Sequence, residues 1–379
     1  MRSAVLICVT MVASACTSTA SGPRLELPPG PQIAGEGGGP EVYRREDGLH
    51  HAAFPIMGTR CELTLGTSDR ALAASIAGAA LAELRRIDAV MSEWRSDSEV
   101  SRVNASAGVR PVAAGAELRA VVSRALEAAA LSGGAFDPTW AGMRGLWRFG
   151  DAMEGVVPDD EAIERARAKV DWRRVVVDDD AGTIFLREKG MALGLGGIAK
   201  GHAVDRLAAI VRAAGIRDFT VRLGGDLYAS GRPWTVGIQD PRRPDAIVAM
   251  AELADQAFST SGDYERYFVK DGVRYHHLID PATGRPATAS RSVTALCPDA
   301  TTAEVVTKPV FIFGPERGIP YATSQGCEVA VIDAAGRLHS SPGLEARLRV
   351  PDGGGLTAPA GDPPRPRASD PATNGPPEG

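Results

Sequence analysis

The spacing of apolar residues predicts both strands and helices in the middle of the chain. Residues 61–66, CELTLG, alternate apolar and polar side chains, as a strand with one buried face does. Residues 69–94 are rich in alanine and repeat apolar side chains at helical spacing, which predicts a long amphipathic helix with Ser68 as its N-cap. Residues 117–134 predict a second helix that ends at glycines.

Neighbouring strands with short turns between them indicate antiparallel sheet. Residues 173–178 and 182–188 are joined by DDA and predict a hairpin. Further strands are predicted in the segments 219–231, 234–240, 276–281, 291–298 and 327–333. Because hairpin connections with inserted helices are typical of α+β proteins, we predict an α+β fold with largely antiparallel sheets.

A glycine-rich turn leads directly into a helix at residues 194–215, GLGGIAKGHAVDRLAAIVRAAG. Glycines allow a ligand to approach the backbone closely, and amides at the start of a helix attract phosphate. Lys200 adds a positive charge to this turn. We therefore expect a nucleotide phosphate to bind here, and the alternative is a turn whose glycines serve packing alone.

Residues 303–314, AEVVTKPVFIFG, begin like a helix, but Pro309 has no backbone donor and predicts an early end. Glu304 and Lys308 stand four residues apart, so on a helix they share one face. The pair is either an exposed salt bridge, which would contribute only about 0.3–0.5 kcal/mol, or part of an altered active site.

The first residues predict export. Arg2 precedes an apolar run that is too short to span a bilayer, and residues 1–15 fit a signal peptide. The run ends in ASAC, which resembles the bacterial lipoprotein signal, so Cys16 is the expected lipid-bearing residue. An ordinary secretory signal is the alternative. We expect the protein to be exported, lipid-anchored to a bacterial membrane, and facing the periplasm.

The composition of the two flanks separates them from the body of the chain. Residues 16–50 and 351–379 are rich in glycine and proline and lack an apolar period, which predicts a flexible tether and a disordered tail. Residues 51–350 are therefore the predicted functional domain. With 379 residues and 44% hydrophobic composition, the chain can bury a large core in one domain or two lobes.

Charge and cysteine content narrow the function classes. A net charge of −5 and a pI near 5.8 argue against a nucleic-acid-binding protein, which would need a basic face.

Three cysteines, Cys61, Cys297 and Cys327, remain in the predicted domain. They allow one disulfide in an oxidising compartment, between an undetermined pair, and buried free thiols are the alternative.

Seven motifs occur in order between about residues 54 and 345: FPIMGTRCELTL, MSEWRSDSEVSRVN, GGAFDPT, the glycine-rich turn and helix above, RLGGDLYASG, STSGDYERYF and HHLIDPATGRPA. On these motifs the chain resembles the FAD:protein FMN transferase family, which is ApbE-like and was formerly called thiamine biosynthesis lipoproteins. The resemblance implies a two-lobed α+β fold with FAD in the cleft between the lobes. It also implies magnesium-assisted transfer of FMN from FAD to a threonine of an exported target protein, with release of AMP.

The resemblance also implies roles for individual residues. It places His277 as the catalytic base and the backbone carbonyl of Ala203 on the metal. The positions that would contact FAD are Met57, Trp94, Ala135, Phe136, Asp137, Lys200 and Leu278. Each has a structural alternative: His277 could be bonded inside the sheet, Trp94 and Phe136 could be core aromatics, and Asp137 and Asp263 could cap turns.

The chain departs from the family pattern at the expected metal site. Glu304 stands where the family has an aspartate and Lys308 where it has a threonine, both of which would bind magnesium. Glutamate keeps the oxygen ligands, but a protonated lysine cannot ligate a metal. A shift of one residue would bring in Thr307, although it would turn that side chain by about 100° around the helix. A further departure is Gly194, which replaces an aspartate that would support the turn.

These departures leave two interpretations of the pair. In one, the Lys308 ammonium lies where magnesium would sit, paired to Glu304 and facing the diphosphate, so that FAD still binds and FMN is transferred slowly or without metal. In the other, the protein is catalytically impaired and binds FAD or a partner. An FAD pyrophosphatase is a further alternative.

Overall fold

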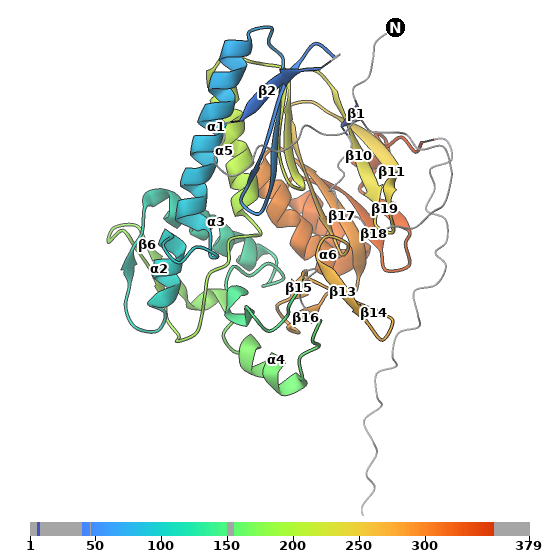
Figure 1. The fold of residues 1–379 in the computed structure, drawn as a ribbon. Helices are drawn as coiled ribbons and strands as arrows, with labels where there is room; N and C mark the ends of the chain where they lie inside the picture. Colours follow the sequence, from blue (N-terminus) through green and yellow to red (C-terminus); the bar gives the residue numbers. More distant parts are fainter. Residues whose placement is uncertain (1–5, 8–39, 46, 150–154, 352–379) are drawn as a thin grey trace, which may run out of the picture.

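The computed structural model describes residues 6–7, 40–45, 47–149 and 155–351. Its main feature is a nine-stranded sheet in the order β19-β18-β17-β12-β9-β8-β4-β3-β2, in which every neighbouring pair is antiparallel (Figure 1). The strands are β2 (Glu41–Arg44), β3 (His50–Ile56), β4 (Thr59–Leu65), β8 (Phe219–Leu223), β9 (Asp226–Ser230), β12 (Gln256–Gly262), β17 (Ser290–Cys297), β18 (Glu328–Asp333) and β19 (Leu338–Ser340).

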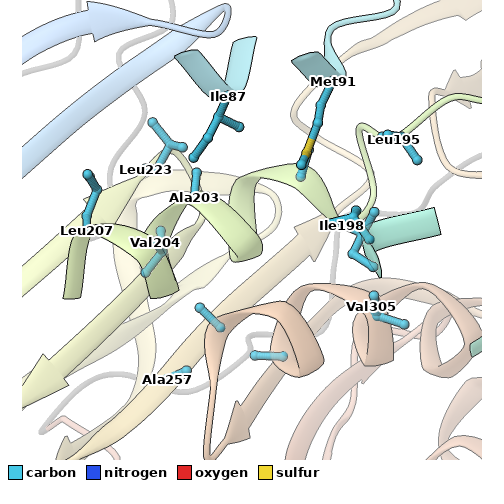
Figure 2. Close-up of a cluster of buried hydrophobic side chains, with 14 of the residues drawn as sticks. Ile87, Met91, Leu195, Ile198, Ala203, Val204, Leu207, Leu223, Ala257 and Val305 are labelled. Atoms are coloured by element: carbon cyan, nitrogen blue, oxygen red, sulfur yellow. The ribbon is translucent and has the colours of Figure 1, made fainter. Parts of the chain in front are cut away.

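Three helices pack on one face of this sheet: α1 (Arg70–Met91), α5 (Ala199–Ala213) and α6 (Ala300–Ser324). Strand residues alternate between the two faces, so Val329 and Val331 of β18 join the core under these helices. Ala330 and Ile332 instead join a second core with β10 (Trp234–Asp240) and β11 (Arg243–Leu253). Figure 2 shows part of the first core, where α1 and α5 meet.

A smaller sheet, β5-β7-β6, lies with α2, α3 and α4 at the end of the molecule opposite β2 (Figure 1). The remaining elements are β5 (Val112–Ala113), β6 (Val175–Asp178), β7 (Thr183–Leu186), α2 (Glu99–Ala105), α3 (Ala116–Leu131), α4 (Asp160–Arg167), α7 (Pro342–Glu345), β13 (Tyr267–Lys270), β14 (Val273–His276), β15 (Ile279–Asp280), β16 (Arg285–Pro286) and the 3-10 turns Ala141–Met143 and Trp172–Arg174. The predicted α+β class and largely antiparallel pairing are confirmed, including the hairpin of β6 and β7.

Helix α1 begins one residue later than predicted. Its N-cap is Asp69, not Ser68, and the Asp69 carboxylate accepts hydrogen bonds from the backbone N–H groups of Ala71 and Leu72. Both residue types are good N-caps. The carboxylate also brings a negative charge to the positive end of the helix dipole, which favours aspartate at this position.

Helix α6 does not end at Pro309, so the prediction of an early stop was wrong. It continues to Ser324, with one break at Gly314, where φ is 72° and ψ is −176°. Pro309 removes one helical hydrogen bond. It is buried together with Val310 and Phe311, and the packing of this stretch on the sheet outweighs the local loss.

The stretch predicted as a flexible tether contains a strand in its last part. Strand β2 pairs with β3 at the edge of the main sheet, with Val42 opposite Ala52. In the predicted signal segment, β1 (Leu6–Ile7) pairs in parallel with β10. The rest of that segment, Cys16 and the predicted tail from residue 352 lie outside the described residues.

Within the described ranges, no helix combines the length and apolarity that crossing a bilayer requires.

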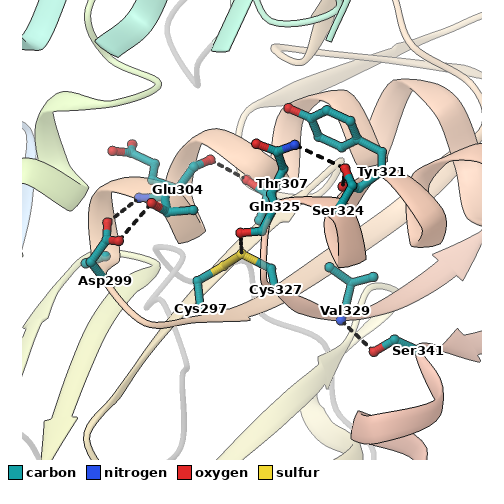
Figure 3. The surroundings of a disulfide bond; sticks show 12 residues. Cys297, Asp299, Glu304, Thr307, Tyr321, Ser324, Gln325, Cys327, Val329 and Ser341 are labelled. Carbon is teal, nitrogen blue, oxygen red and sulfur yellow. Dashed lines mark hydrogen bonds between the residues drawn. A yellow bond between two sulfur atoms is a disulfide. The ribbon is translucent and has the colours of Figure 1, made fainter. Parts of the chain in front are cut away.

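The structure decides which cysteines pair. Cys297, at the end of β17, is bonded to Cys327, just before β18 (Figure 3). Cys61 is buried and free. The bond therefore joins the two segments that flank α6. Burial raises the pKa of the Cys61 thiol, so this cysteine is an unreactive core residue.

Candidate functional site

The starts of α5 and α6 lie against each other and cap each other. A Cβ atom on Gly201 would lie 2.3 Å from the carbonyl oxygen of Ala300, so only glycine permits this approach. Glu304 Oε2, on α6, accepts from the N–H of Gly201 at 2.7 Å. In return Asp205, on α5, accepts from the N–H groups of Ala300 at 2.8 Å and Thr301 at 2.9 Å. The glycine-rich turn is thus fixed to α6.

A buried charge network extends from this contact. The Lys200 ammonium donates to Asp226 Oδ2 at 2.5 Å and to Glu304 Oε1 at 2.7 Å. The second oxygen of Asp226 accepts from the hydroxyl of Ser259 at 2.6 Å. The Glu304 side chain is 0% exposed and that of Asp226 is 2% exposed. Two buried acids from distant parts of the chain therefore share one ammonium, that of Lys200, whose side chain is 29% exposed.

The pKa shifts in this network follow from burial and charge. Burial alone would lower the pKa of Lys200, but Asp226 and Glu304 outweigh it and raise that pKa, so Lys200 stays an ammonium. Burial and the negative charge of Asp226 raise the pKa of Glu304, against the opposite effect of Lys200 and Lys308.

Lys308 is not part of an exposed salt bridge. Its ammonium donates to the backbone carbonyl of Glu304 at 2.7 Å and lies 3.8 Å from Glu304 Oε1. Burial lowers the pKa of Lys308, and the Glu304 carboxylate opposes that shift. Because the Glu304 carboxylate is fully buried, the interpretation of the pair as a solvated surface bridge was wrong.

Phe136 and Lys308 both lie beside Gly197 of the glycine-rich turn. A Cβ atom on Gly197 would lie 3.1 Å from a ring carbon of Phe136 and 3.6 Å from Cε of Lys308. Thr307 points elsewhere, because its hydroxyl donates to the Glu304 carbonyl and bonds Ser261 on β12. Among neighbouring positions on α6, Lys308 is therefore the one beside the turn.

Gly194 has a structural role of its own. The indole N–H of Trp140 donates to the Gly194 carbonyl at 3.0 Å. A Cβ atom at Gly194 would lie only 2.7 Å from that indole nitrogen, so no larger side chain fits. The support of the turn that we expected to be lost is supplied by Trp140.

The two adjacent histidines differ in their contacts. His276 bonds the carbonyl of Ala287 through Nε2 at 2.9 Å, and its Nδ1 accepts from the N–H of Leu278 at 3.3 Å. His277 Nδ1 is buried and has no hydrogen-bond partner in the described part of the chain. Burial, then the charges of His276 and Arg266, lower the pKa of His277 to about 3, with a smaller effect of Lys308. His276 therefore has a partner at each ring nitrogen, whereas His277 has none at Nδ1 among the described residues.

Several predicted FAD positions border the glycine-rich turn. Phe136 touches it, and Glu93, next to Trp94, lies with its carboxylate 3.7 Å from a Cβ built on Gly196. Trp94 is 69% exposed, and the Arg144 guanidinium lies over its ring at 4.8 Å. Trp94 is thus an exposed aromatic that stacks with Arg144 rather than part of the core.

Other predicted positions have structural partners. Asp137 accepts from the backbone and hydroxyl of Thr139 and from the N–H of Trp172, so it caps a turn. Asp263 makes a bidentate ion pair with Arg242. The rest are dispersed: Met57 has a φ of 51° in the turn between β3 and β4, Ala135 is half-buried before Phe136, and Leu278 packs against the first core.

The donors present do not fit a magnesium ion. Within residues 40–45, 47–149 and 155–351 there is no group of three His, Cys, Asp or Glu side chains that could hold a metal. Both oxygens of Glu304 already accept hydrogen bonds, one of them from the Lys200 ammonium, and the Lys308 ammonium lies 3.8 Å from that same oxygen. An ion bound to Glu304 would therefore lie beside two positive charges.

Sequence reasoning missed three acids of the site. Asp226 follows the glycines of RLGGDLYASG, which was the signal available. Glu93 is buried, and that burial raises its pKa. Burial also raises the pKa of Glu265, and the positive charge of Lys200 opposes that shift.

Comparison with known proteins gives one consistent result. Residues 57–332 match the model of the ApbE family. A Treponema pallidum protein named FAD:protein FMN transferase is 35% identical over 327 residues, which cover 78% of this chain and 89% of that protein. A Klebsiella pneumoniae protein of the same name is 32% identical over 286 residues, covering 73% of this chain and 82% of its own length.

Solved structures show the same family likeness. The ApbE protein from Thermotoga maritima superposes with a TM-score of 0.74 at 31% identity, covering 79% of this chain and 99% of that one. The flavin transferase ApbE from Vibrio cholerae superposes with a TM-score of 0.69 at 30% identity, covering 82% of this chain and 100% of that one.

Proposed function

Because the chain belongs to the ApbE family, we propose that it is an FAD:protein FMN transferase. In this reaction the hydroxyl oxygen of a target threonine bonds to the phosphorus on the FMN side of the diphosphate. The bond from that phosphorus to the AMP oxygen breaks, and AMP leaves. The observation that carries the proposal is the family match along residues 57–332, and the site at α5 and α6 supports it.

His277 is the proposed base. A pKa of about 3 keeps its imidazole neutral near pH 7, and its buried Nδ1 lacks a partner within the described residues. A neutral nitrogen of this kind accepts a proton when a threonine hydroxyl is brought within hydrogen-bond distance. A bound diphosphate would raise the pKa of His277 toward neutrality, since a nearby negative charge favours the imidazolium.

Lys308 is the proposed cation for the phosphate oxygens. It lies beside Gly197 in the turn that leads into α5, and its ammonium has a single hydrogen-bond partner among the described residues. The backbone N–H of Gly201 is already taken by Glu304. The positive charge for the diphosphate therefore comes from lysine side chains more than from the amides of the helix start.

The flavin and adenine rings would be held in a cleft between the two lobes. The exposed face of Trp94 is available for stacking, and Phe136 borders the same turn. We propose the remaining positions, Met57, Ala135, Asp137, Lys200 and Leu278, as further FAD contacts. Asp137 would contribute to the FAD site by fixing the turn that it caps.

Magnesium is implied by the resemblance, with Ala203 and Glu304 as its ligands. Since the residues at this position do not fit the ion, we assign no step of the reaction to it. We propose export and lipid attachment at Cys16 from the sequence of the leader, which would place the reaction on exported targets at the membrane surface.

The test is transfer to a defined acceptor. The purified full chain is incubated with FAD and an acceptor protein carrying one exposed threonine, and intact mass is measured. We expect FMN to be added to this acceptor and not to its Thr→Val variant. FAD binding without AMP release would instead favour a flavin-binding interaction protein. AMP release without a labelled acceptor would favour an FAD pyrophosphatase.

A further inference from the structure

Two lysine ammonium groups converge on one carboxylate. Lys200 Nζ lies 2.7 Å from Glu304 Oε1, and Lys308 Nζ lies 3.8 Å from the same oxygen. Asp226 supplies a second carboxylate, 2.5 Å from Lys200. We call Lys200 and Lys308 the lysine pair. With both acids ionised, the pair and its two carboxylates carry no net charge.

The four carboxylate oxygens of this network all accept hydrogen bonds already. Glu304 accepts from the Lys200 ammonium and from the N–H of Gly201. Asp226 accepts from Lys200 and from the hydroxyl of Ser259. A divalent ion that used a remaining lone pair of these oxygens would lie beside two positive charges. Magnesium also needs near-ideal octahedral geometry from oxygen ligands, which an ammonium cannot supply.

One member of the pair has donors to spare. Lys200 is held between two acids, whereas Lys308 has only the Glu304 carbonyl as a hydrogen-bond partner in the described part of the chain. A lysine ammonium has three N–H donors, so two remain for oxygens of an anion. Lys308 adjoins the glycine-rich turn, since its Cε lies 3.6 Å from a Cβ atom built on Gly197.

We propose that the lysine pair supplies the positive charge that a divalent metal would otherwise supply, so that FMN transfer by this protein needs no metal ion. The proposal rests on the proposed function for its substrate. Lys200 holds Glu304 and Asp226 in place, and Lys308 stabilises the charge that develops on the phosphate oxygens as the AMP oxygen leaves. No further reactant enters the reaction.

The first test asks whether the full chain binds and needs a metal. Binding of Mn²⁺ is measured by electron paramagnetic resonance, with and without FAD, and transfer is measured with EDTA or with added Mg²⁺. We expect no stoichiometric Mn²⁺ binding and equal transfer rates. Stoichiometric binding, or loss of transfer in EDTA that Mg²⁺ restores, would overturn the proposal. If no condition gives transfer, the proposed function fails. The Mn²⁺ measurement then still shows whether the site of the lysine pair binds a divalent ion.

The second test separates the charge of Lys308 from its packing. Lys308→Met keeps the length of the side chain and removes the ammonium, while Lys308→Arg keeps the charge. We expect Lys308→Met to lose about 10²-fold in transfer rate, the usual effect of removing one transition-state donor, and Lys308→Arg to keep most of it. Thermal unfolding of both variants checks that they fold. A folded Lys308→Met that transfers as fast as the unchanged protein would overturn the proposal.

Discussion

At the scale of single residues, His276 and His277 have different surroundings although they are adjacent. His276 uses both ring nitrogens to bond the backbone, at Ala287 and Leu278. His277 leaves Nδ1 without a described partner. A buried polar atom without a partner costs free energy, which is tolerated where a ligand or a reaction uses it.

Replacing His277 tests this assignment. We expect His277→Gln to bind FAD and to lose about 10²–10⁴-fold in transfer rate, the range for removal of a general base. His276→Gln is the matched control, and we expect it to lower stability because it breaks two backbone contacts. Fluorescence titration of FAD, transfer rates and melting curves of both variants provide the check. A His277→Gln variant with full activity would exclude His277 as the base.

The pH profile gives a second test of His277. Its folded-state pKa of about 3 lies below the ordinary value of 6.5, so the free protein carries a neutral imidazole down to acidic pH. We therefore expect kcat/KM for FAD to stay flat between about pH 5 and pH 7, since this parameter reports the free enzyme. A fall in kcat/KM centred near pH 6.5 would show that His277 titrates as an exposed histidine.

Local sequence patterns predicted several residues of the site but not the contacts between residues that are distant in sequence. The four-residue spacing of Glu304 and Lys308 placed them on one helical face, as found. Lys200 lies 104 residues from Glu304 in sequence, so nothing local predicts their contact. The pairing of Lys200 with Asp226 is likewise set by the antiparallel order of the sheet and the helices above it.

At the scale of elements, the contact between α5 and α6 determines the site. The two helices cap each other through Glu304 and Asp205, and Gly201 allows their close approach. The sequence predicted the start of α5 from its glycines. The predicted end of α6 at Pro309 was wrong, because packing against the sheet outweighs the local preference that ends helices at proline.

The close approach at Gly201 predicts a large cost for a single methyl group. Gly201→Ala would place Cβ 2.3 Å from a backbone oxygen, which must then shift, so we expect a loss of about 1–3 kcal/mol in unfolding free energy. Gly78→Ala is the matched control, since Gly78 lies in α1 with nothing within 4 Å of the added Cβ.

We expect Gly78→Ala to gain about 0.5–1 kcal/mol, because alanine is the better helix former. Denaturant unfolding followed by circular dichroism measures both variants. Equal stabilities for Gly201→Ala and the unchanged protein would contradict the close helix contact.

At the scale of the whole molecule, apolar patterning and short turns were sufficient to predict the fold class. Strand β2 was not predictable, because it is a short edge strand of four residues that is held by pairing with β3 rather than by its own pattern. The sequence also left the disulfide pairing undetermined, because that pairing depends on β17 and β18 being neighbours in the sheet.

The disulfide predicts how the molecule responds to reduction. Cys297 and Cys327 are 30 residues apart, and a loop of that length contributes about 3–4 kcal/mol in the chain-entropy description. We expect dithiothreitol to lower the melting temperature of the protein. The double variant Cys297→Ala/Cys327→Ala should melt lower and should not respond to the reductant. An unchanged melting temperature in dithiothreitol would show that the bond is not formed.

The most direct test of the account is the ratio of AMP released to FMN attached when FAD and a threonine-bearing acceptor are mixed with the full chain. AMP is measured by chromatography, and attached FMN by the intact mass of the acceptor in the same sample. Transfer predicts one AMP for each FMN attached throughout the reaction. AMP that accumulates with no FMN on the acceptor would contradict transferase function.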